Sequence, residues 1–403
     1  MRARVSIIVL ASGLTMAAPV LASDAGYIYG RIETVDGDKY QGQLRWGDEE
    51  AFWDDLFNAD KAENENLALL DPETLDRVRS RHWSSWLFGA GTHDPSLMHS
   101  LAVRFGDLRR LEIQGGSDVI AEFRNGDELP LHGGSNDIGA LITVADPRLG
   151  TREVHWSHIR SIEFMDTPSK LQPRLPGEPI YGTVKSGRYD FTGRIQWDND
   201  ETLTSDKLDG DVEGDREHIA FGDVTRIRKH RHGALVTLKS GEELYMTGTN
   251  DVNGDNRGVI VIVPGLGSVK VGWADFDEAL LKPAPESGES YADFGPAHDL
   301  TGTVVTRDGR YDGRMVFDLD EARDFELLQG MNGATEYQIP FRDIARIDPK
   351  GYRRTDVELK MGLTIELEDG QDVSHKNDGL LIFAGARKPK YVPWRDVTEV
   401  VFR

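Results

Sequence analysis

The sequence predicts an all-β protein made of three tandem repeats, each with two related halves. The first observation is a seven-residue pattern, clearest at Phe341–Ile347, in which Asp follows an aromatic residue by two positions and apolar residues follow it by three and six. The second is that the pattern recurs, once with His in place of Asp, and that its first residues alternate between phenylalanine and tryptophan: Phe105, Trp156, Phe221, Trp273, Phe341 and Trp394. Such regular recurrence is typical of a repeat protein.

Each copy of the pattern predicts a strand, one tight turn and a second strand. Apolar residues alternate before the aromatic position, as in Tyr337–Phe341, which indicates a strand with one buried face. An Asp two positions later, such as Asp343, favours a capped turn because its carboxylate can accept hydrogen bonds from nearby backbone N–H groups. The apolar residues that follow are then expected to close the end of a small barrel.

A hairpin marked by glycines opens each repeat. Its first strand contains Gly30, Gly182 or Gly302, and a second glycine is followed four residues later by an aromatic residue and then by an acidic loop. We expect these loops to be solvated tips that discourage edge-to-edge pairing. The second glycines and their aromatic residues are Gly42 and Trp46, Gly193 and Trp197, and Gly313 and Phe317.

Two small antiparallel barrels per repeat are the architecture that these units favour. A five-stranded barrel whose last two strands are joined by one helical turn resembles the Src-homology-3-like and Sm-like barrels, and the resemblance covers the hairpin and capped turn of each half. It implies a fold alone, because no functional motif of those families is matched. A six-bladed β-propeller with one blade per half-repeat is the alternative.

The composition along the chain places the boundaries of the repeats. The three repeats span residues 27–166, 180–281 and 298–403. The two segments between them, 167–179 and 282–297, contain several prolines and no hydrophobic period, which is typical of extended connectors.

Only the first repeat carries an insert, at about residues 59–95. Asp71-Pro72-Glu73-Thr74 combines a cap, a first-turn proline and an acidic first turn, so a helix is predicted to begin there. The aromatic segment after it forms either a lid on its own barrel or an exposed patch for a partner. Because the other repeats close without the insert, we expect them to fold when it is deleted. The candidate partner-binding residues are Trp83, Trp86, Leu87 and Phe88.

The start of the chain predicts export. Residues 1–22 have the layout of a secretory signal peptide, with arginines first, then an apolar core that ends in small residues; a retained membrane anchor is the alternative. No later segment is apolar enough to span a membrane, so a periplasmic or secreted location is expected. The formal net charge of −22 argues against nucleic acid and anionic membrane surfaces as partners. The lack of cysteine excludes disulfides and a thiol nucleophile.

The only recurring polar pair in the second halves is Asn-Asp, at Asn136-Asp137, Asn250-Asp251 and Asn377-Asp378. In the second repeat it extends to a stretch that resembles the start of a calcium-binding loop, although the twelfth position holds Ile262 rather than Glu. Asn and Asp also favour tight turns for local reasons. The weak calcium candidates are Asp251, Asn253 and Asp255.

Serine-hydrolase, metalloprotease and phosphate-loop motifs do not occur in the sequence. We therefore expect a non-catalytic binding or scaffolding protein of the bacterial cell envelope, with an envelope protein or a cell-wall polymer as its partner and no cofactor apart from calcium. The alternatives are an envelope enzyme acting on a polysaccharide or cell-wall polymer, and a calcium-binding structural protein. Since equivalent repeats should not all be catalytic, an enzyme requires one repeat that differs chemically from the others.

Overall fold

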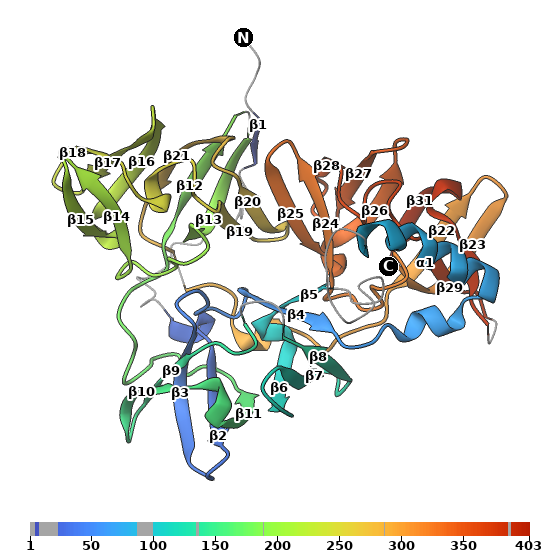
Figure 1. Ribbon diagram of the computed structural model, residues 1–403, viewed down its shortest axis with the longest axis horizontal. Helices are drawn as coiled ribbons and strands as arrows, with labels where there is room; N and C mark the ends of the chain where they lie inside the picture. Colours follow the sequence, from blue (N-terminus) through green and yellow to red (C-terminus); the bar gives the residue numbers. More distant parts are fainter. Residues whose placement is uncertain are drawn as a thin grey trace, which may run out of the picture. The chain divides into compact units, whose positions relative to one another are not determined.

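The computed structural model describes residues 5–7, 23–86, 100–133, 137–187, 189–285, 287–385 and 388–403, with side chains from residue 23 onward except in 81–86. Over these residues the fold is all-β, as predicted, with mainly antiparallel strands and a single α-helix, α1 (Pro72–Trp86) (Figure 1). The chain forms two compact units. Unit 1 contains the described residues up to Asp55, Leu141–Phe294 and Gly333–Tyr337, and unit 2 contains Leu56–Ala140, Gly295–Asn332 and Gln338–Arg403.

The predicted second repeat forms an antiparallel sheet in unit 1. Its strands are β12 (Tyr181–Ser186), β13 (Tyr189–Trp197), β14 (Lys207–Val212), β15 (Asp215–Ala220), β16 (Val224–His230), β17 (Gly233–Leu238), β18 (Glu243–Met246), β19 (Val259–Val263), β20 (Gly267–Val271) and β21 (Phe276–Leu281). They pair in the order β20-β19-β13-β12-β21-β16-β17-β18. The β14–β15 hairpin reaches this sheet through a bridge between Asp211 and Thr247. A short strand, β1 (Val5–Ile7), runs parallel to β13.

Five strands of the predicted first repeat also lie in unit 1. They are β2 (Tyr29–Thr34), β3 (Lys39–Trp46), β9 (Ile142–Asp146), β10 (Gly150–Val154) and β11 (Ile159–Phe164). Their order, β10-β9-β3-β2-β11, repeats that of β20-β19-β13-β12-β21.

Unit 2 contains the remaining strands of the first repeat and those of the third, except that residues 335–337 of the third repeat belong to unit 1. The former are β4 (Leu56–Lys61), β5 (Ser100–Arg104), β6 (Leu108–Ile113), β7 (Asp118–Phe123) and β8 (Glu128–His132), paired in the order β6-β7-β8-β4-β5. The latter are β22 (Thr301–Thr306), β23 (Gly309–Val316), β24 (Leu327–Asn332), β25 (Thr335–Pro340), β26 (Ile344–Pro349), β27 (Arg354–Leu359), β28 (Thr364–Glu368), β29 (Leu380–Phe383), β30 (Lys390–Val392) and β31 (Val397–Phe402). Nine of these pair in the order β30-β29-β23-β22-β31-β26-β27-β28-β24.

The predicted pair of closed barrels per repeat is not what the described strands form, because their sheets remain open. Strands from the two halves of a repeat pair with each other: β12 and β13 of the first half bind β21 and β19 of the second. A propeller blade built from one half-repeat is excluded for the same reason. Sequence similarity between the halves therefore indicated the local strand–turn–strand unit correctly but not how these units pair.

Of the six predicted tight turns, the one at Trp273 is a hydrogen-bonded turn that is not 3-10, and the other five are single 3-10 turns. These are η3 (Phe105–Asp107), η4 (Trp156–His158), η5 (Phe221–Asp223), η8 (Phe341–Asp343) and η9 (Trp394–Asp396). The Asp side chain does not cap its turn, because the capping position is the residue before the aromatic one and no cap hydrogen bond forms there. The other 3-10 turns are η1 (Asp24–Gly26), η2 (Glu65–Leu69), η6 (Asn250–Val252) and η7 (Tyr291–Asp293).

The repeated glycines are explained by close backbone contacts. In each opening hairpin the two glycines face each other: Gly30 pairs with Gly42, Gly182 with Gly193, and Gly302 with Gly313. A Cβ atom at the second glycine would lie 1.9, 2.0 or 2.2 Å from a carbonyl oxygen of the next strand in the three copies. Only glycine therefore lets these strands approach without a backbone shift.

The aromatic residue four positions after each second glycine anchors the core. Trp46, Trp197 and Phe317 are fully buried. Each packs edge-to-face against the tryptophan that starts a second-half turn, with ring centroids 5.8, 6.4 and 5.7 Å apart, respectively: Trp156, Trp273 and Trp394. The alternating aromatic pattern in the sequence thus reflects one contact made in each repeat.

The segment 167–179, expected to be an extended connector, packs against other residues of unit 1. Leu171 is buried in a cluster with Tyr27, Phe52 and Leu203 of unit 1. Arg174 pairs with Asp24 at 3.1 Å. This segment is therefore part of the core of unit 1.

The insert packs on strands of the third repeat within unit 2 (Figure 1). Its apolar side chains and those that they contact are Leu67, Leu70 and Val78 on one side and Val316, Leu319 and Leu381 on the other. Deletion of residues 59–95 would uncover this apolar surface, so on this structure we expect the deletion to destabilise the third repeat, in contrast to the expectation from the sequence. The described apolar side chains Leu67, Leu70 and Val78 of the insert thus cover part of the third repeat.

Candidate functional site

The described residues of the third repeat form a pocket. One of its walls is a stacked pair of side chains: Tyr352, in the β26–β27 turn, and His375, in the β28–β29 connection. The two rings are 3.7 Å apart between centroids and 13° from parallel. The backbone N–H of His375 donates to the carbonyl oxygen of Tyr352 at 2.8 Å, which holds the two loops together. Tyr352 is 70% exposed, so the stacked pair is accessible to a ligand.

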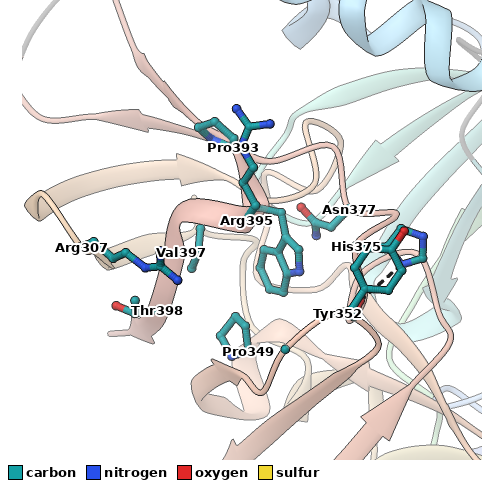
Figure 2. Close-up of a pocket in the computed structure, with 11 residues that line it drawn as sticks. Arg307, Pro349, Tyr352, His375, Asn377, Pro393, Arg395, Val397 and Thr398 are labelled. Atoms are coloured by element: carbon teal, nitrogen blue, oxygen red, sulfur yellow. Dashed lines mark hydrogen bonds between the residues drawn. The ribbon is translucent and has the colours of Figure 1, made fainter.

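The facing wall comes from the β22–β23 turn and from the segment around η9. Figure 2 shows Arg307, Val397 and Thr398 across the pocket from the stacked pair. Trp394 also lines the pocket and is fixed in place by its contact with Phe317. The cavity has a volume of about 600 Å³, which lies within the range of small-molecule sites.

Two polar groups of this pocket, at Arg307 and Trp394, are donors without an acceptor among the described residues. Arg307 forms no hydrogen bond or ion pair with any described residue, and Arg395 has only Asp396 at 3.9 Å. The indole N–H of Trp394, whose side chain is 5% exposed, has no acceptor among the described residues. None of the described lining residues is Asp or Glu. The pocket is therefore suited to a ligand that presents negative charge and hydrogen-bond acceptors.

The loop that carries His375 has a direct counterpart in the second repeat. Asn377 accepts from the N–H of Gly379 at 2.8 Å, and Asn256 accepts from the N–H of Gly258 at 2.9 Å. Counting back from these asparagines places Gly254 where the third repeat has His375. The second repeat consequently has no ring at this position to stack upon.

The hydrogen bonds in these loops also show that Asn377-Asp378 does not correspond to Asn250-Asp251. Asp251 accepts from the backbone N–H of Asp209 at 2.7 Å, and its counterpart in the third repeat is Asp372, which accepts from Gln329 at 2.6 Å. Asp378 instead donates its backbone N–H to Asp318. Asn377-Asp378 is thus a local coincidence of sequence and not a third copy of Asn250-Asp251.

The calcium candidates lie in the loop around η6. Asp251 is buried and accepts from Asp209, while Asn253 accepts from the backbone N–H of Asp255 at 2.7 Å. Asp255 is exposed. Two of the three proposed ligand side chains thus already accept hydrogen bonds that shape the loop.

The candidate partner patch falls at the end of α1. Trp83 and Trp86 belong to the last turns of the helix. Leu87 and Phe88 lie outside the described residues. The position of the helix agrees with the start predicted at Asp71, whose side chain accepts from the N–H of Thr74 at 3.0 Å.

The acidic loops are not the solvated tips that the sequence predicts. Glu50, Glu201 and Glu321 each use their carbonyl oxygen to accept from the N–H of the aromatic residue four positions earlier, at 2.8, 2.7 and 2.8 Å. In Glu201 and Glu321 one carboxylate oxygen is buried without a hydrogen-bond partner among the described residues. This hydrogen bond between the aromatic N–H and the glutamate carbonyl oxygen closes a tight turn, and the turn directs carboxylate groups of the loop toward the protein interior.

Burial sets the protonation of these carboxyl groups. Desolvation, reinforced by the nearby acids Asp251, Asp200 and Asp198, raises the pKa of Glu201 to about 9. Desolvation also raises the pKa of Asp251, to about 6, against the opposing hydrogen bond from Asp209. Glu201 is therefore expected to be neutral at pH 7, which relieves repulsion in the loop.

We expect the substitution Glu201→Gln to reduce the dependence of stability on pH. The folded-state pKa is raised, so the stabilisation is complete below the ordinary pKa of 4.5 and is lost as pH rises toward about 9. The loss for one such group is at most about 1.4 kcal/mol per pH unit. Urea unfolding at pH 5, 7 and 9 should show that the variant gains on the wild type as pH rises.

The control for this experiment is Glu217→Gln, which removes an exposed acid from β15. Glu217→Gln also removes one negative charge, so it shows how much of any gain in stability comes from reduced charge repulsion alone. If the two variants gained equally between pH 5 and pH 9, the protonated Glu201 would be ruled out.

Searches against known protein families, curated proteins and solved structures found no match. Within the described part of the chain, no helix has both the length and the apolar character needed to cross a membrane.

Proposed function

We propose that this chain is an exported, non-catalytic binding or scaffolding protein of the bacterial cell envelope, located in the periplasm or secreted. The observation that carries the proposal is the third-repeat pocket, because it combines exposed rings with unpaired donors. The leader-like residues 1–22 support export. A site of this composition can bind an anionic group, and its described lining contains no carboxylate that would repel one.

The alternative of an envelope enzyme acting on a polysaccharide has weaker support. The third repeat meets one requirement for an enzyme, since its pocket contains His375 where the second repeat has Gly254. Most glycoside hydrolases, however, need two carboxyl groups flanking the bond that is cleaved. The described residues that line this pocket include none. Glu201 and Glu321, each with one buried carboxylate oxygen, occupy corresponding turns of two repeats, which favours a structural role for both.

A calcium-binding structural role also has less support than ligand binding. Asp251 and Asn253 accept backbone hydrogen bonds in their loop, and calcium would have to share those oxygens.

The partner is proposed to be an envelope protein or a cell-wall polymer, with Trp83 and Trp86 as one contact surface. The wild-type mature protein, used as bait in an envelope extract, should retain a partner without turnover of added cell-wall or polysaccharide fragments. The double variant Trp83→Ala/Trp86→Ala should capture less of this partner, because large rigid rings contribute much of the free energy of binding at interfaces.

The matched control is Tyr245→Ala, which removes a half-exposed ring from β18 in the second repeat. It should leave capture unchanged. Cleavage of any offered fragment would overturn the non-catalytic proposal, and equal capture by the double variant would remove the patch at the end of α1 from the interface.

A further inference from the structure

The third-repeat pocket is positively charged in a strongly acidic protein. The chain has a formal net charge of −22, yet Arg307 lines this pocket and forms no ion pair with a described acidic residue. The overall charge repels an anion at long range, so attraction must come from Arg307 at short range. A guanidinium group binds a carboxylate or a phosphate through two parallel hydrogen bonds.

The rings and apolar side chains of the pocket call for more than a small anion. Tyr352 and His375 present a flat stacked surface, and Pro349, Trp394 and Val397 add apolar contact. Acetate or inorganic phosphate would leave this surface unused. A ligand that fills the pocket therefore carries a ring beside its negative charge.

The hydrogen-bonding groups distinguish a sugar ring from an aromatic one. Trp394 as a whole is 5% exposed, and its indole N–H has no acceptor among the described residues. The hydroxyl of Thr398 donates to the carbonyl oxygen of Val305 at 3.1 Å, which leaves its lone pairs for a donor. A ring bearing hydroxyl groups can satisfy both, whereas a plain aromatic ring satisfies neither.

We propose that the pocket binds a sugar ring bearing a carboxylate, as a free sugar acid or as a unit of an acidic polysaccharide. The carboxylate would pair with Arg307, and the ring would lie against the Tyr352–His375 pair. This inference rests on the proposed binding function and specifies its ligand.

The test is calorimetric titration of the full mature chain with glucuronate, glucose, acetate, inorganic phosphate and benzoate. Glucuronate is expected to bind at least about tenfold more tightly than each of the others. Equal binding of glucose would overturn the role of charge, and equal binding of acetate or phosphate would overturn the role of the ring. Equal binding of benzoate would overturn the assignment of a sugar.

Three variants connect the result to the pocket. Arg307→Gln and Tyr352→Ala should each weaken glucuronate binding about tenfold, because each removes one of the two recognised features. Both residues are exposed, so the fold should tolerate the changes. Arg353→Gln is the control, since this exposed arginine is paired with Asp369 and does not line the pocket. Unchanged affinity in both pocket variants would overturn the site.

This outcome can be separated from the outcome for the proposed function. If glucuronate does not bind but the bait still captures an envelope partner, the ligand assignment fails and the binding function stands. If neither occurs, both fail.

Discussion

Replacing Lys61 with methionine is expected to lower the free energy of unfolding of unit 2 by about 3–5 kcal/mol. Lys61 is 6% exposed, and its Nζ donates to Glu326 at 2.5 Å and lies 3.1 Å from a carboxylate oxygen of Asp320. Burial alone would lower the pKa of Lys61, but the carboxylates of Glu326, Asp320 and Glu321 outweigh it and raise the pKa. Methionine keeps the apolar stem and removes the charge, which leaves buried carboxylates without their cation.

The measurement is urea unfolding of Lys61→Met beside the control Lys39→Met. Lys39 pairs with Glu33 at 3.0 Å but is largely exposed, so its loss should cost no more than about 1 kcal/mol. Adding Glu326→Gln to Lys61→Met should recover part of the stability, because the amide keeps the acceptor for the backbone N–H groups of Ala322 and Arg323. Equal effects of the two single substitutions would contradict this account.

Lys61 forms one of three similar ion pairs that join repeats in the described part of the chain. In each acidic loop, a second acidic residue lies five positions after the glutamate: Asp55 after Glu50, Asp206 after Glu201, and Glu326 after Glu321. Its carboxylate accepts hydrogen bonds from backbone N–H groups of the same loop and pairs with a cationic side chain of another repeat. In unit 1, Asp55 lies 2.6 Å from Arg194, and Asp206 lies 2.9 Å from Arg45. Because each of the first two repeats supplies both an acid and an arginine, the ion pairs join them reciprocally.

The local units were predictable because their signals are local. Alternating apolar residues, the repeated aromatic residues and the helix start at Asp71 all depend on neighbours in sequence. Strand pairing was not predictable, since β13 binds β19 across the length of the repeat and half-repeat similarity suggested separate barrels instead. The ion pairs have the same non-local origin.

The pocket escaped prediction because it is a departure from the repeat. Arg307, Tyr352, His375 and Arg395 come from four separate turns, and none recurs in the other copies at the corresponding place. A search for recurring residues passes over such positions. A signal was present in the sequence, since His375 replaces Gly254 of the second repeat, but it required the loop alignment that the hydrogen bonds of Asn256 and Asn377 provide.

The conserved geometry of the hairpins gives the second large expected effect. Gly193→Ala should lower the free energy of unfolding of unit 1 by about 3 kcal/mol, at the upper end of the cost of overpacking. The new Cβ would lie 2.0 Å from the carbonyl oxygen of Ile262, and this oxygen belongs to the backbone of β19, so no side-chain rotation can relieve the clash. The strands β13 and β19 must separate to accommodate the methyl group.

Urea unfolding, combined with amide hydrogen exchange in Val259–Val263, measures this effect. Protection in β19 should fall in Gly193→Ala because its partner strand moves away. The control is Gly254→Ala in the same repeat, where the added Cβ meets no atom within 4 Å and the backbone needs no positive φ. That substitution should be nearly neutral. A similar small loss in both variants, with β19 protection intact, would show that the strands yield easily and that the paired glycines do not set their spacing.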